Sequence, residues 1–146
     1  MSSTYGQMAQ TKYSSVFHSY PLSNDLKMAE LVSLGLPAGI LRHLAVAFGV
    51  QPSGIAPYVN ISEKTILRRL GSRGKLKPDE SERVARLMRV FVRAVDVLED
   101  EDRARGWLAK PLRVLGGRPP LSLMASEQGA REVEHVQGRL EYGVFA

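Results

Sequence analysis

The sequence of 146 residues contains no cysteine and only three histidines, His18, His43 and His135. Without thiols the chain has neither disulfide bonds nor a thiolate zinc site, and the histidines show no spacing typical of a metal or catalytic set. We therefore expect no cofactor, no metal ion and no catalytic residue. A chain without disulfides suits a reducing compartment such as the cytoplasm.

Long apolar runs are also missing. No stretch approaches the roughly 18 consecutive apolar residues of a transmembrane helix, and residues 1–10 lack the basic and apolar regions of a signal peptide. We expect a soluble, cytoplasmic protein with no membrane partner.

Hydrophobic residues make up 44% of the chain, enough to fill a real core. Residues 1–24, rich in Ser, Thr, Gln and Tyr, are predicted to form a mobile arm or a loosely docked extension.

Positive charge is concentrated in one window of the chain. The net charge is +5, and residues 61–77 hold six cationic side chains against a single acidic one, namely Lys64, Arg68, Arg69, Arg73, Lys75 and Lys77 against Glu63. Such a window is either a solvated cationic face or a binding surface for a polyanion. Charge alone leaves both interpretations open.

Apolar spacing and helix-stop residues predict an all-α fold. A first helix is expected from residue 24 or 25 to residue 34, ended by Gly35. A second is expected over residues 37–48, with Pro37 in its first turn and Gly49 as its C-terminal stop.

Residues 50–70 are then typical of a helix-turn-helix, because two short helical patterns are joined by a tight turn. Ser62 is a good N-cap for the second helix, residues 63–70. Within that helix Ile66 and Leu70 lie four residues apart and can both face the core. The turn geometry favours a DNA-binding interpretation over a solvated cationic face.

The second helix of such a motif reads base edges with its N-terminal residues, while neighbouring cations contact phosphates. The residues in these roles would be Lys64, Thr65 and Arg68 for readout, and Ser62, Arg69 and Arg73 for positioning. Binding should then fall steeply with salt, and a symmetric dimer would favour a palindromic operator.

The longest helical pattern covers residues 78–98. Its broad apolar stripe needs packing partners on two sides and comprises Val84, Leu87, Met88, Phe91, Val95 and Leu98. Helices are also expected over residues 101–109, 121–126 and 127–142, the last with a buried edge of Ala130, Val133, Val136 and Leu140. Trp107 lies in the turn-rich connection and is expected to anchor this module as a core residue.

The last forty residues carry a further pattern, in the order Trp107-Leu108, Pro111, Leu115-Gly116-Gly117, Pro119-Pro120-Leu121, Gly129, Val133, Leu140, Tyr142-Gly143. This order resembles the toxin-binding domain of the Xre/MbcA/ParS antitoxin family. The upstream helix-turn-helix region is similar to the Xre-like DNA-binding part of the same antitoxins. The resemblance implies a DNA-binding bundle at residues 25–77, a core and dimerisation helix at 78–98 and a toxin-binding domain at 99–146.

Membership of this family would imply an antitoxin that neutralises a RES-domain toxin, an enzyme that consumes NAD, and that represses the shared operon as a homodimer bound to operator DNA. The chain's end would then either fold back on its own core or plug the toxin's active site with Phe145 and the terminal carboxylate. The candidate toxin-binding residues are Arg139, Tyr142, Gly143, Val144, Phe145 and Ala146.

Two other classes of function remain. A helix-turn-helix transcriptional regulator without a toxin partner would share the DNA-binding features, and its C-terminal module would only dimerise or sense a ligand. A small enzyme is disfavoured because no nucleophile, base and orienting group converge by spacing.

Overall fold

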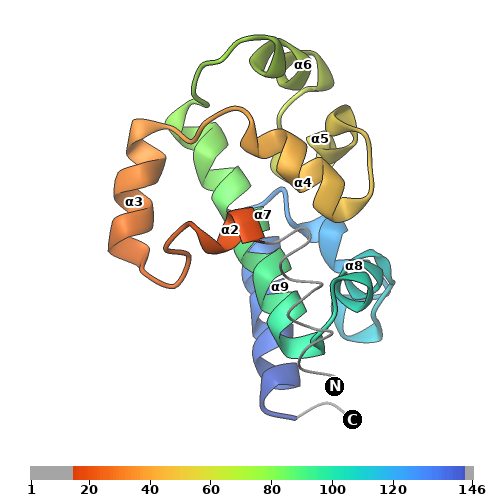
Figure 1. Ribbon diagram of the computed structural model, residues 1–146. Helices are drawn as coiled ribbons and strands as arrows, with labels where there is room; N and C mark the ends of the chain where they lie inside the picture. The colour runs from red at the N-terminus through yellow and green to blue at the C-terminus, as the bar shows by residue number, and fades with distance from the viewer. Residues whose placement is uncertain (1–14, 144–146) are drawn as a thin grey trace.

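The computed structural model describes residues 15–143, and this part of the chain is built from helices without a strand (Figure 1). The α-helices are α2 (Ser15–His18), α3 (Asp25–Leu34), α4 (Ile40–Phe48), α5 (Ala56–Val59), α6 (Glu63–Gly71), α7 (Pro78–Leu98), α8 (Glu101–Ala109) and α9 (Glu127–Glu141). The 3-10 helices are η2 (Pro52–Ile55), η3 (Arg113–Leu115) and η4 (Pro120–Leu123). The prediction of an all-α fold is confirmed, and none of these helices could span a lipid bilayer.

Helix α7 runs through the centre of the molecule and has the bounds expected from the sequence. It packs against α3 and α5 on the N-terminal side and against α8 and α9 on the C-terminal side. The predicted apolar stripe is fully buried from Val84 to Val95, while Leu98 at its end is half-buried. Because the stripe is broad, several helices together bury it.

The N-terminal part corrects one expectation. Phe17 in α2 is fully buried, and its ring packs edge-on against Phe91 of α7 with centroids 5.9 Å apart. Phe91 also packs against Phe48 of α4, with centroids 5.2 Å apart. Residue 17 therefore belongs to the core, so the predicted mobile or loosely docked segment of residues 1–24 is too long. Residues 1–14 lie outside the described part of the chain.

The start of α4 also differs from the prediction. The helix begins at Ile40 rather than at Pro37, which instead forms an isolated antiparallel bridge with Lys75. Beside this bridge the N–H of Leu36 donates to Ser81 Oγ at 2.9 Å, and the N–H of Leu76 donates to the Leu36 carbonyl at 2.8 Å. The Leu36 carbonyl, which would accept an N–H in the first turn of a helix starting at Pro37, is occupied by this pairing.

The C-terminal half begins with α8, whose N-cap Asp100 accepts from the Arg103 N–H at 2.9 Å. Helix α9 begins at Glu127 after the N-cap Ser126, whose Oγ accepts from the Gly129 N–H at 3.0 Å, and it ends at Glu141, one residue before the expected end. The short helix expected over residues 121–126 is the 3-10 helix η4. Trp107 is half-buried and packs against the core, in agreement with the prediction that it anchors this module.

Candidate functional site

Helix α5, the turn after it and α6 form the helix-turn-helix. Asn60 ends α5 in the left-handed conformation with φ 51°, which reverses the chain, and Ile61 is buried beneath the turn. Ser62 caps α6, because its Oγ accepts from the Thr65 N–H at 3.1 Å and donates to Thr65 Oγ1 at 2.9 Å. The predicted cap is confirmed, and the Ser62 hydroxyl is thereby engaged within its own helix.

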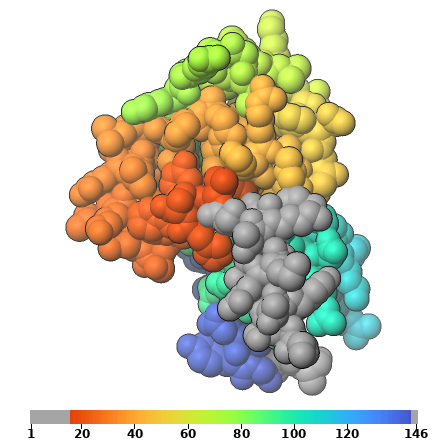
Figure 2. Space-filling view, in the orientation of Figure 1, coloured from red at the N-terminus to blue at the C-terminus, as the bar shows by residue number. Residues whose placement is uncertain are grey.

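Helix α6 has a core face and an outward face. Ile66 is fully buried, whereas Lys64, Leu67 and Arg68 are exposed. Successive residues of an α-helix are about 100° apart, so Lys64 and Arg68 point away from Ile66, and Leu67 lies at one flank of this outward face, next to the exposed Glu63. Figure 2 shows the segment around α6 at one edge of the molecule, with no other element covering it from outside. Thr65 lies half-buried beside this face.

Arg69 is held by α7. Its Nε and Nη2 donate to the two carboxylate oxygens of Glu80 at 3.1 and 3.2 Å, and only 8% of the Glu80 side chain is exposed. The same carboxylate accepts from the Lys77 N–H at 2.9 Å at the start of α7. Arg69 therefore fixes α6 on α7, and two of its three guanidinium nitrogens are engaged in doing so.

Arg73 lies in the loop after α6 and lines a hollow of about 320 Å³ together with Arg42, from the outer side of α4. The remaining walls come from the bridged segments, at Pro37, Ala38, Gly39, Leu70, Ser72 and Gly74. Sequence reasoning missed Arg42, because its only signal was one cation on the polar face of a helix distant in sequence. Lys64 and Arg68 thus lie on the outward face of α6 with Thr65 beside it, Arg73 lies with Arg42 at the hollow after α6, and Ser62 and Arg69 make contacts within the fold.

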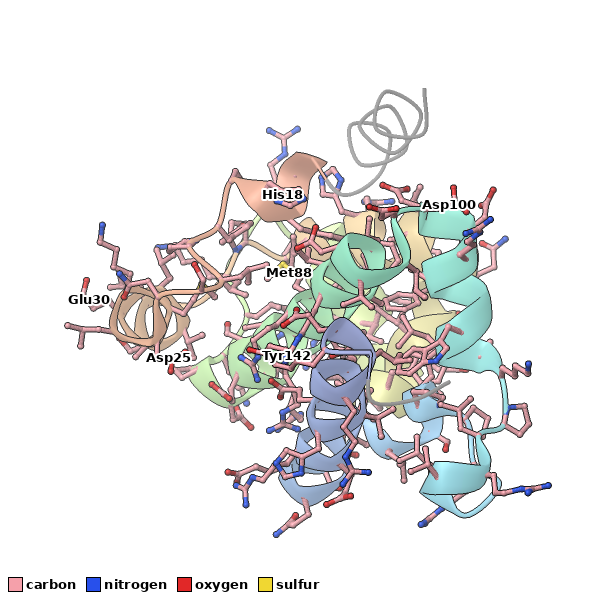
Figure 3. The ribbon with its side chains drawn as sticks, turned by 90° about the horizontal axis from the view of Figure 1, so that it is seen from below. His18, Asp25, Glu30, Met88, Asp100 and Tyr142 are labelled. Atoms are coloured by element: carbon pink, nitrogen blue, oxygen red, sulfur yellow. The ribbon has the colours of Figure 1, made fainter. Side chains whose placement is uncertain are left out.

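The end of α9, which carries the candidate residues Arg139 and Tyr142, lies at the other end of the molecule from α6 (Figure 1). Arg139 and Tyr142 line a hollow of about 670 Å³ between α9 and α7, whose further walls are Arg93, Glu134, His135 and Gly138. Tyr142 is 82% exposed, and Gly143 follows with φ +68°. Figure 3 labels Tyr142 at the end of α9. The predicted residues Val144, Phe145 and Ala146 lie outside the described part of the chain.

Polar contacts between α7 and α9 fix the walls of this hollow. Arg89 donates to both carboxylate oxygens of Glu134 at 3.2 Å. Arg93 forms an ion pair with Glu141 at 3.7 Å, and the buried Gln137 donates to the Val90 carbonyl at 2.8 Å. Sequence reasoning gave Arg93 no role, because its signal was only that of a solvated helix face.

An acidic group lies close to the same contacts. Burial raises the pKa of the Asp96 carboxyl on α7, while His18 lowers that pKa and the Glu141 carboxylate raises it. The carboxyls of Asp96 and Glu141 therefore interact across the α7–α9 contact, next to the hollow's arginines. This end of the molecule presents charges of both signs, unlike the cationic surface at α6.

Comparison with protein families matches two models that together cover most of the chain. Residues 27–89 match the antitoxin Xre-like helix-turn-helix domain, and residues 93–143 match the antitoxin Xre/MbcA/ParS C-terminal toxin-binding domain. The two models meet inside α7. The surface at α6 therefore lies in the part similar to a DNA-binding module, and the hollow at Tyr142 in the part similar to a toxin-binding module.

Proteins similar to this chain over most of its length are named antitoxins. An antitoxin Xre of Yersinia enterocolitica is 33% identical over 127 residues, 86% of each chain. An antitoxin Xre of Photorhabdus laumondii is 32% identical over 128 residues, 87% of this chain and 86% of that one. A Sphingobium protein named Prs ADP-ribosylating antitoxin is 24% identical over 125 residues, 80% of this chain and 79% of its own. This chain belongs to the Xre/MbcA/ParS family and is an antitoxin of a toxin–antitoxin system with a helix-turn-helix domain.

Proposed function

We propose that the protein binds operator DNA through α6, as its recognition helix, and represses its own operon. The observation that supports this is the exposed cationic face, with Lys64 and Arg68 pointing away from the buried Ile66. Thr65 beside them suits base readout, and Arg73 suits a phosphate contact. A homodimer would set two recognition helices on the half-sites of a palindrome.

Salt dependence of binding tests this proposal. Affinity for a fragment from upstream of the gene should fall steeply as salt rises, because each phosphate contact releases counterions. Arg73→Ala, which removes the proposed phosphate contact, should lower the log–log slope by about one, and Lys64→Ala, which removes a proposed base contact, should weaken binding to this fragment. Arg131→Ala, which removes an exposed cation from α9, is the matched control. A wild-type slope for Arg73→Ala and wild-type affinity for Lys64→Ala would contradict a role for these cations.

We also infer that the C-terminal end neutralises a RES-domain toxin that consumes NAD, by closing the toxin's active site. The exposed Tyr142 at the rim of a hollow, followed by Gly143 in the left-handed conformation that ends the helix, supports a contact with a partner at this end. A cleft that binds NAD accepts an anionic, partly aromatic ligand. Residues 143–146 would enter that cleft, with Arg139 and Tyr142 at its rim.

Co-expression with the product of the adjacent gene tests this role. The full-length chain should restore host growth and cellular NAD, and a chain lacking residues 143–146 should restore neither, while still binding DNA. Lys64→Ala is the converse control, because it should protect the host although its DNA binding is weaker. Full protection by the truncated chain would refute occlusion by the tail.

The name of the Sphingobium relative favours a second candidate, a toxin that ADP-ribosylates a protein. Both toxin chemistries draw on NAD, so cellular NAD alone does not separate them. Labelling of cell proteins from tagged NAD would increase only with an ADP-ribosylating toxin. A harmless neighbour would instead favour a transcriptional regulator without a toxin partner. In each case the chain acts by binding, and we expect the purified protein to leave NAD intact.

A further inference from the structure

Helix α6 exposes an apolar side chain at one flank of its cationic face. Leu67 has 58% of its surface exposed, although burial of a leucine is favourable. It lies three residues after Lys64 and four after the exposed Glu63, which are its neighbours on the helix surface, and about 100° around the helix from the buried Ile66. Gly71, one further turn along, adds no side chain to this face. The outward face therefore carries two adjacent cations with a leucine at their flank, and free space beyond the leucine.

The charge around Leu67 decides what can cover it. A second copy of the chain packed symmetrically here would bring together two segments that each carry a net charge of +5. Like charges in an apolar contact oppose association. A polyanion instead pairs with both cations and still brings an apolar group against Leu67 when that group lies between its phosphates.

The major groove of DNA has one such group. The C5-methyl of thymine is the apolar feature of the groove floor, and it distinguishes a T·A pair from the others together with the hydrogen-bonding edges. Lys64 and Arg68 can then contact phosphates or the acceptors of a guanine near this thymine. We propose that Leu67 packs on a thymine methyl group of the operator and is a specificity-determining residue of this antitoxin. The proposal rests on the proposed DNA-binding function of α6.

The test uses the full-length protein and the upstream fragment made in two forms, with thymine or with uracil throughout. Uracil lacks only the methyl group, so its hydrogen-bonding edge is unchanged. Wild-type protein should bind the thymine form about fourfold more tightly per contacted methyl, from the transfer free energy of one buried carbon. Leu67→Ala should bind both forms with nearly equal affinity, at about the level of wild-type protein on uracil DNA.

Leu26→Ala is the matched control, because Leu26 in α3 is a leucine that is 74% exposed and lies on another helix of the same module. It should keep both the affinity and the thymine preference. A thymine preference retained by Leu67→Ala, or absent from the wild type, would overturn the inference while leaving DNA binding intact. Absence of binding to either form would instead refute the function on which it rests.

The same variants address a protein partner at this face. Light scattering of wild type and Leu67→Ala without DNA should give the same mass. A smaller mass for Leu67→Ala, together with an unchanged thymine preference, would show that Leu67 belongs to an interface between copies and would overturn the inference.

Discussion

Replacing Glu80 tests how the recognition helix is held. Glu80→Ala removes both oxygens that accept from Arg69, at 3.1 and 3.2 Å, and the acceptor of the Lys77 N–H at 2.9 Å. Loss of the cap contact costs about 1 kcal/mol. Loss of the ion pair costs about 2 kcal/mol, less than for a fully buried pair because 20% of the Arg69 side chain reaches solvent. We expect the free energy of unfolding to fall by about 3 kcal/mol.

Glu80→Gln separates the two contributions. The amide keeps the shape of the side chain and one carbonyl oxygen for the Lys77 N–H, but it removes the negative charge that faces Arg69. Its free energy of unfolding should lie between those of wild type and Glu80→Ala. Thermal unfolding followed by circular dichroism measures both, with roughly 3 °C of Tm per kcal/mol for a chain of this size. Wild-type stability in Glu80→Ala would refute the reasoning.

The same variant has a functional signature. Because Arg69 holds α6 on α7, its release should weaken DNA binding at temperatures where the variant is fully folded. Toxin neutralisation should be unchanged under those conditions, since α9 lies at the opposite end of the molecule. Equal loss of both activities would indicate general unfolding and not release of the recognition helix.

Two further changes test packing and capping. Gly129→Ala should destabilise the fold by about 2 kcal/mol, because its Cβ would collide with the backbone carbonyl of Leu123. Gly106→Ala, in α8 with nothing within 4 Å of the added Cβ, should instead stabilise the fold by about 1 kcal/mol. Denaturant titration gives the free energy of unfolding of both variants. A change of the same sign in both would contradict the collision at Leu123. Ser62→Ala should cost about 1 kcal/mol from loss of the cap on Thr65, and an unchanged denaturation midpoint would contradict it.

The features that sequence predicted well depend on neighbours along the chain. Helix α7 has the predicted bounds because Pro78 suits its first turn and an apolar stripe runs along its length. The cap at Ser62 and the turn at Asn60 follow from local chemistry in the same way. The family resemblance also rested on short-range spacing in the last forty residues, and the matched toxin-binding domain confirms it.

The features that sequence could not give depend on residues far apart. Pro37 looked like a first-turn residue, and only its pairing with Lys75 moves the helix start. Arg69 looked like any other cation of its window, and only the approach of Glu80 turns it into a structural contact. Phe17 lies in a polar segment without periodicity, so nothing local indicated that its ring would be buried. In each case tertiary contact overrides a local signal.

Helix α7 explains why the two functional ends belong to one folding unit. Its adjacent residues serve different sides, since Phe91 packs on Phe17 and Phe48 of the DNA-binding side while the Val90 carbonyl accepts from Gln137 of α9. The boundary between the two family models falls within the same helix. Cutting the chain within α7 would expose buried apolar side chains on both fragments, because the helices on each side of the cut cover part of the same apolar stripe. Glu80, which holds α6, and Arg93, which lines the hollow at Tyr142, are therefore about 20 Å of continuous helix apart, and the two sites share one core.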